Sequence, residues 1–139
     1  MRFVLDTNVV VAAFRSRRGA SNLLLRYAEA REVGLLCSTS LFLEYEAVLA
    51  RADVRAATGH TLADVRAVMN ALAAAAEPVD VRWRTRPMLP DANDEMVLEA
   101  ASNGDADAIV THNVKDFAPA RSLGIEVVTP GVVVRRLRR

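Results

Sequence analysis

Short apolar runs alternate with longer amphipathic stretches along the whole chain. A run of three to five apolar residues bounded by polar or turn-forming residues is typical of a buried strand. Five segments fit this pattern: Arg2–Leu5, Leu35–Cys37, Val79–Trp83, Ala108–Val110 and Ile125–Val128. Because each is separated from the next by a stretch long enough for a crossover, the pattern predicts an α/β domain with a mainly parallel central sheet covered on both faces.

The intervening stretches carry apolar residues every three or four positions, which predicts helices. Ser38, Thr39 and Ser40 can cap one of them, and Gly34 and Pro78 are expected to end two others. The predicted helices are Val9–Phe14, Ala20–Glu32, Leu41–Ala50, Ala52–Gly59, Thr61–Ala76, Glu95–Gly104 and a last one that opens at Pro130. No internal repeat or linker interrupts this order, so residues 1–139 are predicted to form a single domain.

Composition agrees with a globular, reduced protein. The chain has 139 residues, of which 52% are hydrophobic and 25% charged, and its net charge is +1. Cys37 is the single cysteine, so no disulfide within the chain and no pair of thiolates for zinc is possible. Asp6 interrupts the first apolar run, and no later run is long enough to span a membrane. We expect a soluble, cytoplasmic protein that makes no membrane contact.

Arginine supplies almost all of the positive charge, since 18 residues are basic and every one except Lys115 is arginine. Arg15, Arg17 and Arg18 follow the first predicted helix and are candidates for RNA phosphate contacts, because the guanidinium group pairs well with phosphate. A solvated basic turn explains them equally well. A second cluster, Arg135, Arg136, Arg138 and Arg139, closes the chain.

Polar residues gather directly after the predicted strands. In parallel α/β sheets, ligands bind beyond the carboxyl ends of the strands, near the point where strand order reverses. Asp6 follows the first strand, Asp94 enters a helix, and Thr111 follows the fourth strand, while Glu44 lies on the helix after the second. Taken singly, the acids could cap helices or face solvent. Together at one edge they would repel one another unless a divalent cation gathered them, and oxygen ligands favour Mg²⁺ or Mn²⁺.

Four motifs, taken in order, resemble those of a PIN domain. They are LDTNVV (5–10), LEYEAVL (43–49), DANDEMVLEAA (91–101) and ADAIVTHNVKDF (106–117). Each motif is short and common, but four in this order are fairly specific, and the resemblance runs from about residue 2 to about residue 130. The chain resembles the single-domain bacterial PIN proteins that are often classed as toxins of toxin-antitoxin systems, relatives of the VapC-type toxins.

This resemblance implies a three-layer α/β/α fold and an endoribonuclease that depends on Mg²⁺ or Mn²⁺. Carried over residue by residue, the catalytic and metal-binding acids are Asp6, Glu44 and Asp94. Many PIN domains have a fourth acid two residues after the threonine that ends the strand, where this chain has Asn113; Asp116 and Asp91 are the candidates to compensate. Thr7, Asn8 and Thr111 are expected to orient the carboxylates or contact phosphate. The implied partners are RNA, a small antitoxin protein and a second copy of the chain in a homodimer.

Two other interpretations compete with the nuclease. Asn113 in the fourth position suits a PIN-like module that binds RNA or protein without cutting it. A phosphotransfer domain also places an aspartate at a strand end, but the dehalogenase-type phosphatases need an acid two residues later, where this chain has Asn8. A receiver domain would carry its phosphorylated aspartate near the middle of the chain. Both phosphotransfer patterns therefore fit poorly.

Overall fold

The computed structural model describes residues 1–84 and 86–138 and has a five-stranded, wholly parallel sheet at its centre. The strand order is β3-β2-β1-β4-β5. The strands are β1 (Arg2–Leu5), β2 (Gly34–Ser38), β3 (Ala76–Val79), β4 (Ala108–Val110) and β5 (Glu126–Val128). Parallel strands joined by helices confirm the predicted α/β class and agree with a PIN-like fold.

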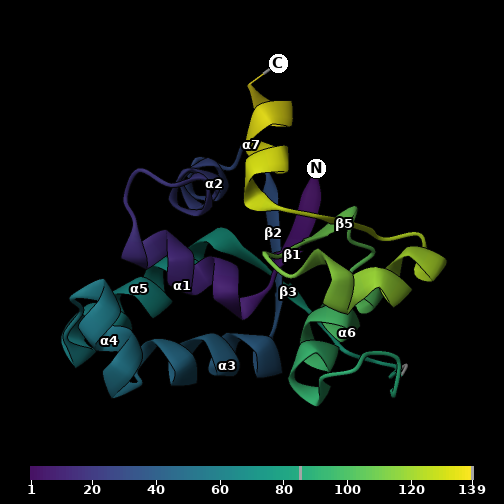
Figure 1. The fold of residues 1–139 in the computed structure, drawn as a ribbon, viewed down its shortest axis with the longest axis horizontal. Helices are drawn as coiled ribbons and strands as arrows, with labels where there is room; N and C mark the ends of the chain where they lie inside the picture. The colour runs from purple at the N-terminus through teal and green to yellow at the C-terminus, as the bar shows by residue number, and fades with distance from the viewer. Residues whose placement is uncertain (85, 139) are drawn as a thin grey trace.

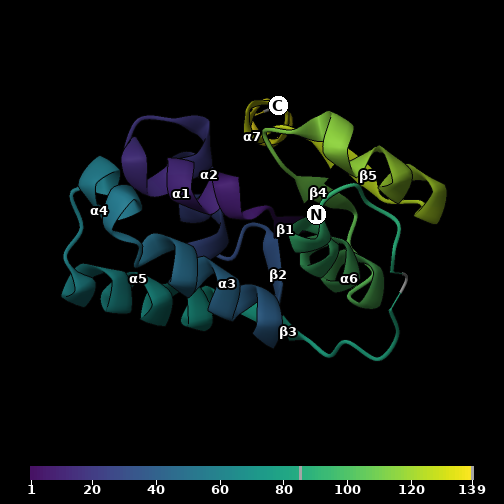
Figure 2. The same ribbon diagram turned by 60° about the horizontal axis from the view of Figure 1, so that its bottom comes forward.

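Helices cover both faces of the sheet (Figure 1). They are α1 (Thr7–Arg15), α2 (Ala20–Glu29), α3 (Thr39–Leu49), α4 (Ala52–Thr58), α5 (Leu62–Ala75), α6 (Glu95–Asn103) and α7 (Pro130–Leu137), with 3₁₀ segments η1 (Ala92–Asp94) and η2 (Val114–Leu123). Figure 2 shows α1 to α5 on one side of the strands and α6 on the other. Strands β1 to β3 and the helices between them form one half of the domain. The chain then crosses to the other side of β1 and adds β4 and β5, which form the other half.

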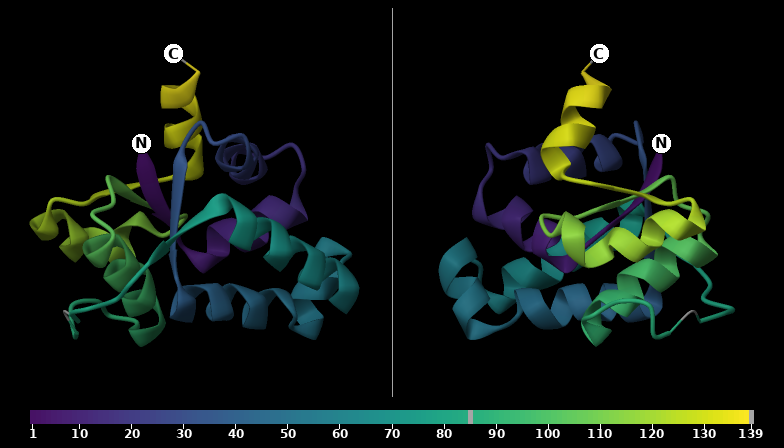
Figure 3. Two further views of the ribbon diagram at one scale, coloured as in Figure 1. Left: turned by 180° about the vertical axis from the view of Figure 1, so that it is seen from behind. Right: turned by 45° about the vertical axis from the view of Figure 1, so that its right-hand side comes forward.

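One connected apolar core lies between these layers. It contains the buried parts of all strands except the edge strand β3, together with the inner faces of the helices. Helix α6 packs against β1, β2 and β4, while α2 packs against α1 and α7. Both termini lie on the same side of the molecule, as the two views of Figure 3 show. No helix in the part of the chain that the structure describes is long and apolar enough to cross a membrane.

Local signals account for several helix boundaries. The Ser38 hydroxyl accepts from the Leu41 amide at 3.2 Å, which caps α3 as its sequence predicts. Thr61 and Asp64 form a reciprocal capping box at the start of α5. Helix α2 ends at Glu29, three residues before its predicted end, because the chain turns at Arg31, whose φ is 60°.

The third strand is the clearest error of the sequence prediction. The expected strand at 79–83 is absent, and β3 lies at Ala76–Val79 with Pro78 inside it rather than at a helix end. Proline is tolerated there because β3 is an edge strand that pairs with β2 alone, so its missing N–H need not serve a second neighbour.

The strand order reverses between β1 and β4, and this reversal positions the candidate site. From β1 the chain proceeds outward to β2 and β3, and it then crosses to β4 and β5 on the other side of β1. The Asp6 amide donates to the Val110 carbonyl at 2.9 Å, which holds the ends of β1 and β4 together. The side chains that follow these two strands therefore open into the crevice where ligands bind in such folds.

Candidate functional site

Asp6 and Thr111 meet at the strand reversal. The Thr111 hydroxyl donates to Asp6 Oδ2 at 2.7 Å, and both side chains are buried, with 7% of Asp6 and 0% of Thr111 exposed. Burial raises the pKa of Asp6, and the hydrogen bonds from Thr111 and from the Thr7 amide oppose that rise. Asp6 is thus a partly desolvated carboxylate that is oriented by its neighbours, and its side chain makes no cap hydrogen bond to α1.

Asp94 lies close enough to Asp6 for their charges to interact. Its pKa is raised to about 6, first by burial and then by the negative charges of Asp6, Asp91, Asp116 and Glu95. Asp94 sits between η1 and α6, and its side chain makes no hydrogen bond that caps the helix. Asp91 caps η1 rather than α6, because its carboxylate accepts from the Asn93 amide at 2.9 Å. The helix-cap interpretation of Asp94 is therefore not supported at the start of α6.

Asp116, on η2, adds to this negative field. Its charge raises the pKa of both Asp6 and Asp94, which places it near the two buried acids although it follows the Asn113 position by three residues. The Asn113 side chain is exposed, and the backbone amide of this residue donates to the Thr111 hydroxyl at 2.9 Å. Of the two residues near the fourth position, Asp116 therefore contributes to the acidic field, while residue 113 supports Thr111 through its backbone alone.

Glu44 lies on α3, one residue before Tyr45. Its neighbour Tyr45 is buried, and the Tyr45 hydroxyl donates to the carbonyl of Leu5, the residue before Asp6. Burial raises the pKa of Tyr45 well above its usual value, and the charge of Asp6 adds to the rise. Glu44 itself is half-buried. Nothing in the sequence pairs Tyr45 with Leu5, since 40 residues separate them.

These acids lie near one another but are not drawn into a closed cage. Among residues 1–84 and 86–138, no three Asp, Glu, His or Cys side chains are close enough to hold one ion. The chemistry of the donors nevertheless fits a hard divalent cation, because oxygen ligands dominate and two of them carry raised pKa values that a cation would relieve. Asp6 and Asp94 are the pair best placed to hold it, and the charge of Asp116 acts on both.

Asn8 and His112 form the rim next to Asp6. The His112 amide lies 3.5 Å from Asn8 Oδ1, and His112 Nε2 lies 3.5 Å from the Ser21 hydroxyl. Positive charge on His112 lowers the pKa of Asp6, although the imidazole is exposed. His112 was not singled out from the sequence, and its place beside Thr111 after a strand was the available signal.

The arginines predicted to contact RNA lie at the other end of α1 from the acids. Asp6 precedes the helix and Arg15 is its last residue, so the nine residues separate them by about 13 Å. Arg15, Arg17 and Arg18 are exposed. In the C-terminal cluster, Arg136 forms a bidentate pair with Glu126 at 2.7 Å, Arg135 and Arg138 are exposed, and Arg139 lies outside the described residues.

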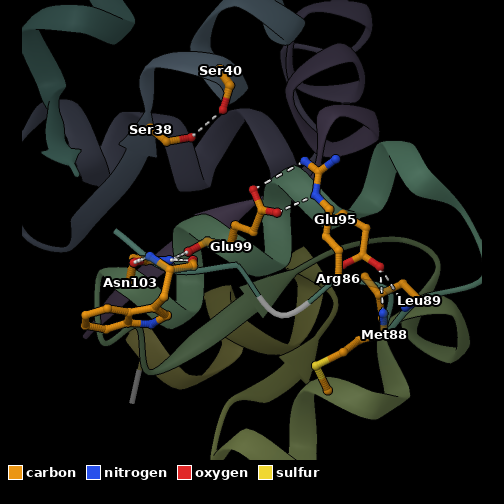
Figure 4. A network of polar contacts seen from close by, with 9 residues as sticks. Ser38, Ser40, Arg86, Met88, Leu89, Glu95, Glu99 and Asn103 are labelled. Carbon is orange, nitrogen blue, oxygen red and sulfur yellow. Dashed lines mark hydrogen bonds and ion pairs between the residues drawn. The ribbon is translucent and has the colours of Figure 1, made fainter. Parts of the chain in front are cut away.

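Sequence reasoning missed a polar stripe on α6 (Figure 4). Glu95, Glu99 and Asn103 are spaced four residues apart, so they share one helix face. Glu95 accepts from the Met88 and Leu89 amides at 2.8 and 3.0 Å, and Glu99 pairs with Arg86. The Asn103 side chain accepts from the Trp83 amide through its oxygen and donates to the Trp83 carbonyl through its nitrogen. The i, i+4, i+8 spacing was the available signal, but carboxylates are rarely fully buried, so the spacing alone does not predict a buried stripe.

With the fold and the site described, comparisons with known proteins define the family. The model of the PIN domain matches residues 2–115, which is more than half of the chain. The chain therefore belongs to the PIN-domain family. A comparison with curated proteins found no significant match.

PIN domains are generally nuclease modules, and PIN-domain nucleases generally use divalent metals. The broad class of activity that is typical of the family is therefore that of a hydrolase acting on nucleic acid. The acidic crevice between β1 and β4 lies where this fold places its ligands.

Proposed function

We propose that this protein is an endoribonuclease that depends on Mg²⁺ or Mn²⁺ and hydrolyses phosphodiester bonds of RNA at the crevice between β1 and β4. The observation that carries the proposal is the coupling of Asp94 with Asp6, which helps raise the pKa of Asp94 to about 6. Two carboxylates that destabilise each other in a partly desolvated crevice are poorly explained as structural groups. Their mutual destabilisation is explained if both carboxylates serve to bind a divalent cation.

Asp6 and Asp94 would hold the cation, with Glu44 and Asp116 as further oxygen donors. When bound, the cation supplies Lewis acidity, which activates water for in-line attack on phosphorus and offsets the charge of the phosphate. Thr111 orients the Asp6 carboxylate through its 2.7 Å hydrogen bond. The backbone amide of Asn113 in turn donates to the Thr111 hydroxyl, and Thr7 and Asn8 line the cavity next to His112, beside the place where a phosphate would enter.

Cleavage of a mixed pool of single-stranded RNA, with and without Mn²⁺, tests this function. Asp6→Asn and Asp94→Asn are expected to reduce cleavage by about 100-fold or more, because each removes a ligand charge. Glu44→Gln should also reduce it, whereas Glu46→Gln, an exposed control on the same helix, should cleave like wild type. Equal cleavage by wild type and both aspartate variants would contradict the proposal, as would activity that survives a chelator.

A non-catalytic module that binds RNA or protein is the alternative function. It is favoured by Asn113 in the fourth acidic position and by the open arrangement of the acids. The same assay separates the two functions. RNA that is retained by the wild-type protein and stays intact with Mn²⁺ present would favour the binding module.

We further propose the biological setting that the family resemblance implies. The protein would act in the cytoplasm as the toxin of a toxin-antitoxin system, as a homodimer restrained by a small antitoxin. Growth arrest on induced expression, relieved by Asp94→Asn, is the outcome expected of such a toxin. Growth unaffected by wild-type protein that is expressed and folded would contradict the toxin role without touching the nuclease activity.

A further inference from the structure

A groove continues from the acidic crevice along α1, and neither the fold nor the proposed chemistry accounts for it. It has a volume of about 510 Å³. Its lining comes from four parts of the chain: Thr7, Asn8, Val11, Ala12 and Arg15 of α1, Val48 of α3, Val54 of α4, and His112 after β4. The groove therefore begins at the rim of the crevice and ends at the first of the candidate RNA-binding arginines.

We propose that this groove is a subsite for one unpaired nucleobase of the RNA strand, next to the phosphate that is cleaved. This inference rests on the proposed function, because it places the substrate of that same site. The structure supports it through three properties of the groove: its position, its walls and the charge at its ends.

The position of the groove links it to the reacting centre. Asn8 and His112 belong to both the groove and the rim beside Asp6, where the His112 amide approaches Asn8 Oδ1 at 3.5 Å. A strand whose phosphate enters the crevice therefore has its neighbouring nucleotide over the groove. Single-stranded RNA presents splayed bases that protein pockets can accept, whereas a paired helix does not.

The walls suit the flat apolar faces of a base. Val11, Ala12, Val48 and Val54 line the middle of the groove, and each is half-buried rather than sealed into the core. The volume lies within the range of about 300 to 1,000 Å³ that is typical of small-molecule sites. Aliphatic walls can enclose a flipped base without aromatic partners, which matters in a chain with only 5% aromatic residues.

The two ends of the groove differ in charge. Negative charge from Asp6 and Asp94 dominates the crevice end and requires a cation before a phosphate can approach. Arg15 stands at the other end, exposed, with Arg17 and Arg18 directly after it. A base between these ends would leave its outer phosphate beside the arginines. One RNA strand that lies along the groove therefore contacts Arg15 as well as the crevice, although Arg15 lies about 13 Å from Asp6.

Binding of labelled single-stranded RNA, measured by fluorescence anisotropy with Ca²⁺ in place of Mn²⁺, tests the subsite. Ca²⁺ offsets the acidic charge at the crevice end, and the binding readout does not require cleavage. Val54→Phe should fill the groove and weaken binding about tenfold, the scale of losing one well-bound base. Val132→Phe, the same change at a half-buried valine on α7, lines no part of the groove and should bind like wild type. An oligonucleotide with abasic ribose throughout should bind Val54→Phe and wild type equally.

Arg15→Ala provides a second variant that needs no repacking, since Arg15 is exposed. It should reduce the dependence of log affinity on log salt by about 0.7, the value of one phosphate contact on a single strand. Arg121→Ala, an exposed arginine outside the groove, should leave that slope unchanged.

The outcomes separate this inference from the proposed function. Wild-type affinity for RNA in both Val54→Phe and Arg15→Ala, each shown to be folded by circular dichroism, would overturn the subsite. That result is also the one expected if the groove instead accepts an apolar segment of a partner protein. RNA cleavage by wild type could still stand in that case, whereas failure to bind any RNA would overturn both proposals.

Discussion

Asp94 is the residue whose environment differs most from that of an ordinary surface acid. Its pKa is raised to about 6 because it is partly buried and faces Asp6, Asp91 and Asp116, while its own helix takes no cap from it. In the unfolded chain the same carboxyl would titrate near 3.8. The folded protein therefore binds a proton at Asp94 more tightly than the unfolded chain does, and ionisation of Asp94 costs stability.

Asp94→Asn should stabilise the metal-free protein at neutral pH. At pH 7 the ionised Asp94 is unfavourable, and its removal should raise the free energy of unfolding by about 1 kcal/mol, a value reduced for solvent screening. The gain should shrink as the pH falls from about 6 toward 3.8, because the wild-type carboxyl becomes protonated in the folded state. Urea denaturation at pH 7 and at pH 4 measures the difference.

Asp105→Asn is the matched control for this comparison. Asp105 is exposed and has a φ of 50°, a conformation that asparagine also tolerates. Its substitution should leave stability nearly unchanged at both pH values. A destabilised Asp94→Asn protein at pH 7 would show that Asp94 has a favourable structural partner, contrary to its assigned environment.

The buried acids show how far single residues could be predicted. Asp6 and Asp94 were identified because a charged residue at a strand end, or beside a helix start, follows directly from the pattern of polar and apolar positions. The role of Thr111 depends on its contact with Asp6, which is 105 positions away in sequence. Glu95 and Glu99 were missed because their partners are backbone amides and an arginine on a segment without regular structure, which no periodicity reveals.

At the scale of elements, α6 connects the core to the candidate site. Its inner face packs on β1, β2 and β4, and its stripe of Glu95, Glu99 and Asn103 holds the segment that leads from β3 to η1. This segment, described at residues 80–84 and 86–91, delivers the chain to Asp91 and Asp94. Glu95 is 2% exposed, and its second oxygen has no hydrogen-bond partner among the described residues.

Glu95→Ala should release this segment from α6. It leaves the Met88 and Leu89 amides without their acceptor, so we expect a loss of about 2 to 4 kcal/mol in stability and faster hydrogen exchange at those two amides. Glu95→Gln retains a carbonyl oxygen in the same place and should protect the amides almost as well as wild type. Unchanged exchange in Glu95→Ala would show that the segment is held by other contacts.

Element boundaries were predictable where a local signal sets them. The cap at Ser38 and the proline at the start of α7 lie where the sequence indicated, and α5 begins within one residue of its predicted start. The sequence prediction misplaced the third strand because Pro78 indicates the end of a helix. The strand accommodates this proline because β3 lies at the edge of the sheet. That property belongs to the tertiary structure and cannot be read locally.

At the scale of the whole molecule, the sheet topology separates two kinds of charge. Strand reversal between β1 and β4 gathers Asp6, Asp94 and Asp116 around one crevice, while Arg15, Arg17 and Arg18 follow the far end of α1. The net charge of +1 is therefore a sum over separated regions and says little about partners. The proposed path of RNA runs between these regions, from the arginines along the groove to the crevice.

The central claim is that Asp6 and Asp94 form a site for a divalent cation. Titration with Mn²⁺, followed by the electron paramagnetic resonance signal of the free ion, tests it directly. We predict saturable binding at pH 7.5 that weakens about tenfold at pH 5, because a proton then competes at Asp94, whose pKa is about 6. Asp94→Asn and Asp6→Asn should lose the binding and Asp105→Asn should retain it. Saturable binding that is unchanged in both site variants, or no saturable binding by the wild-type protein, would contradict the account.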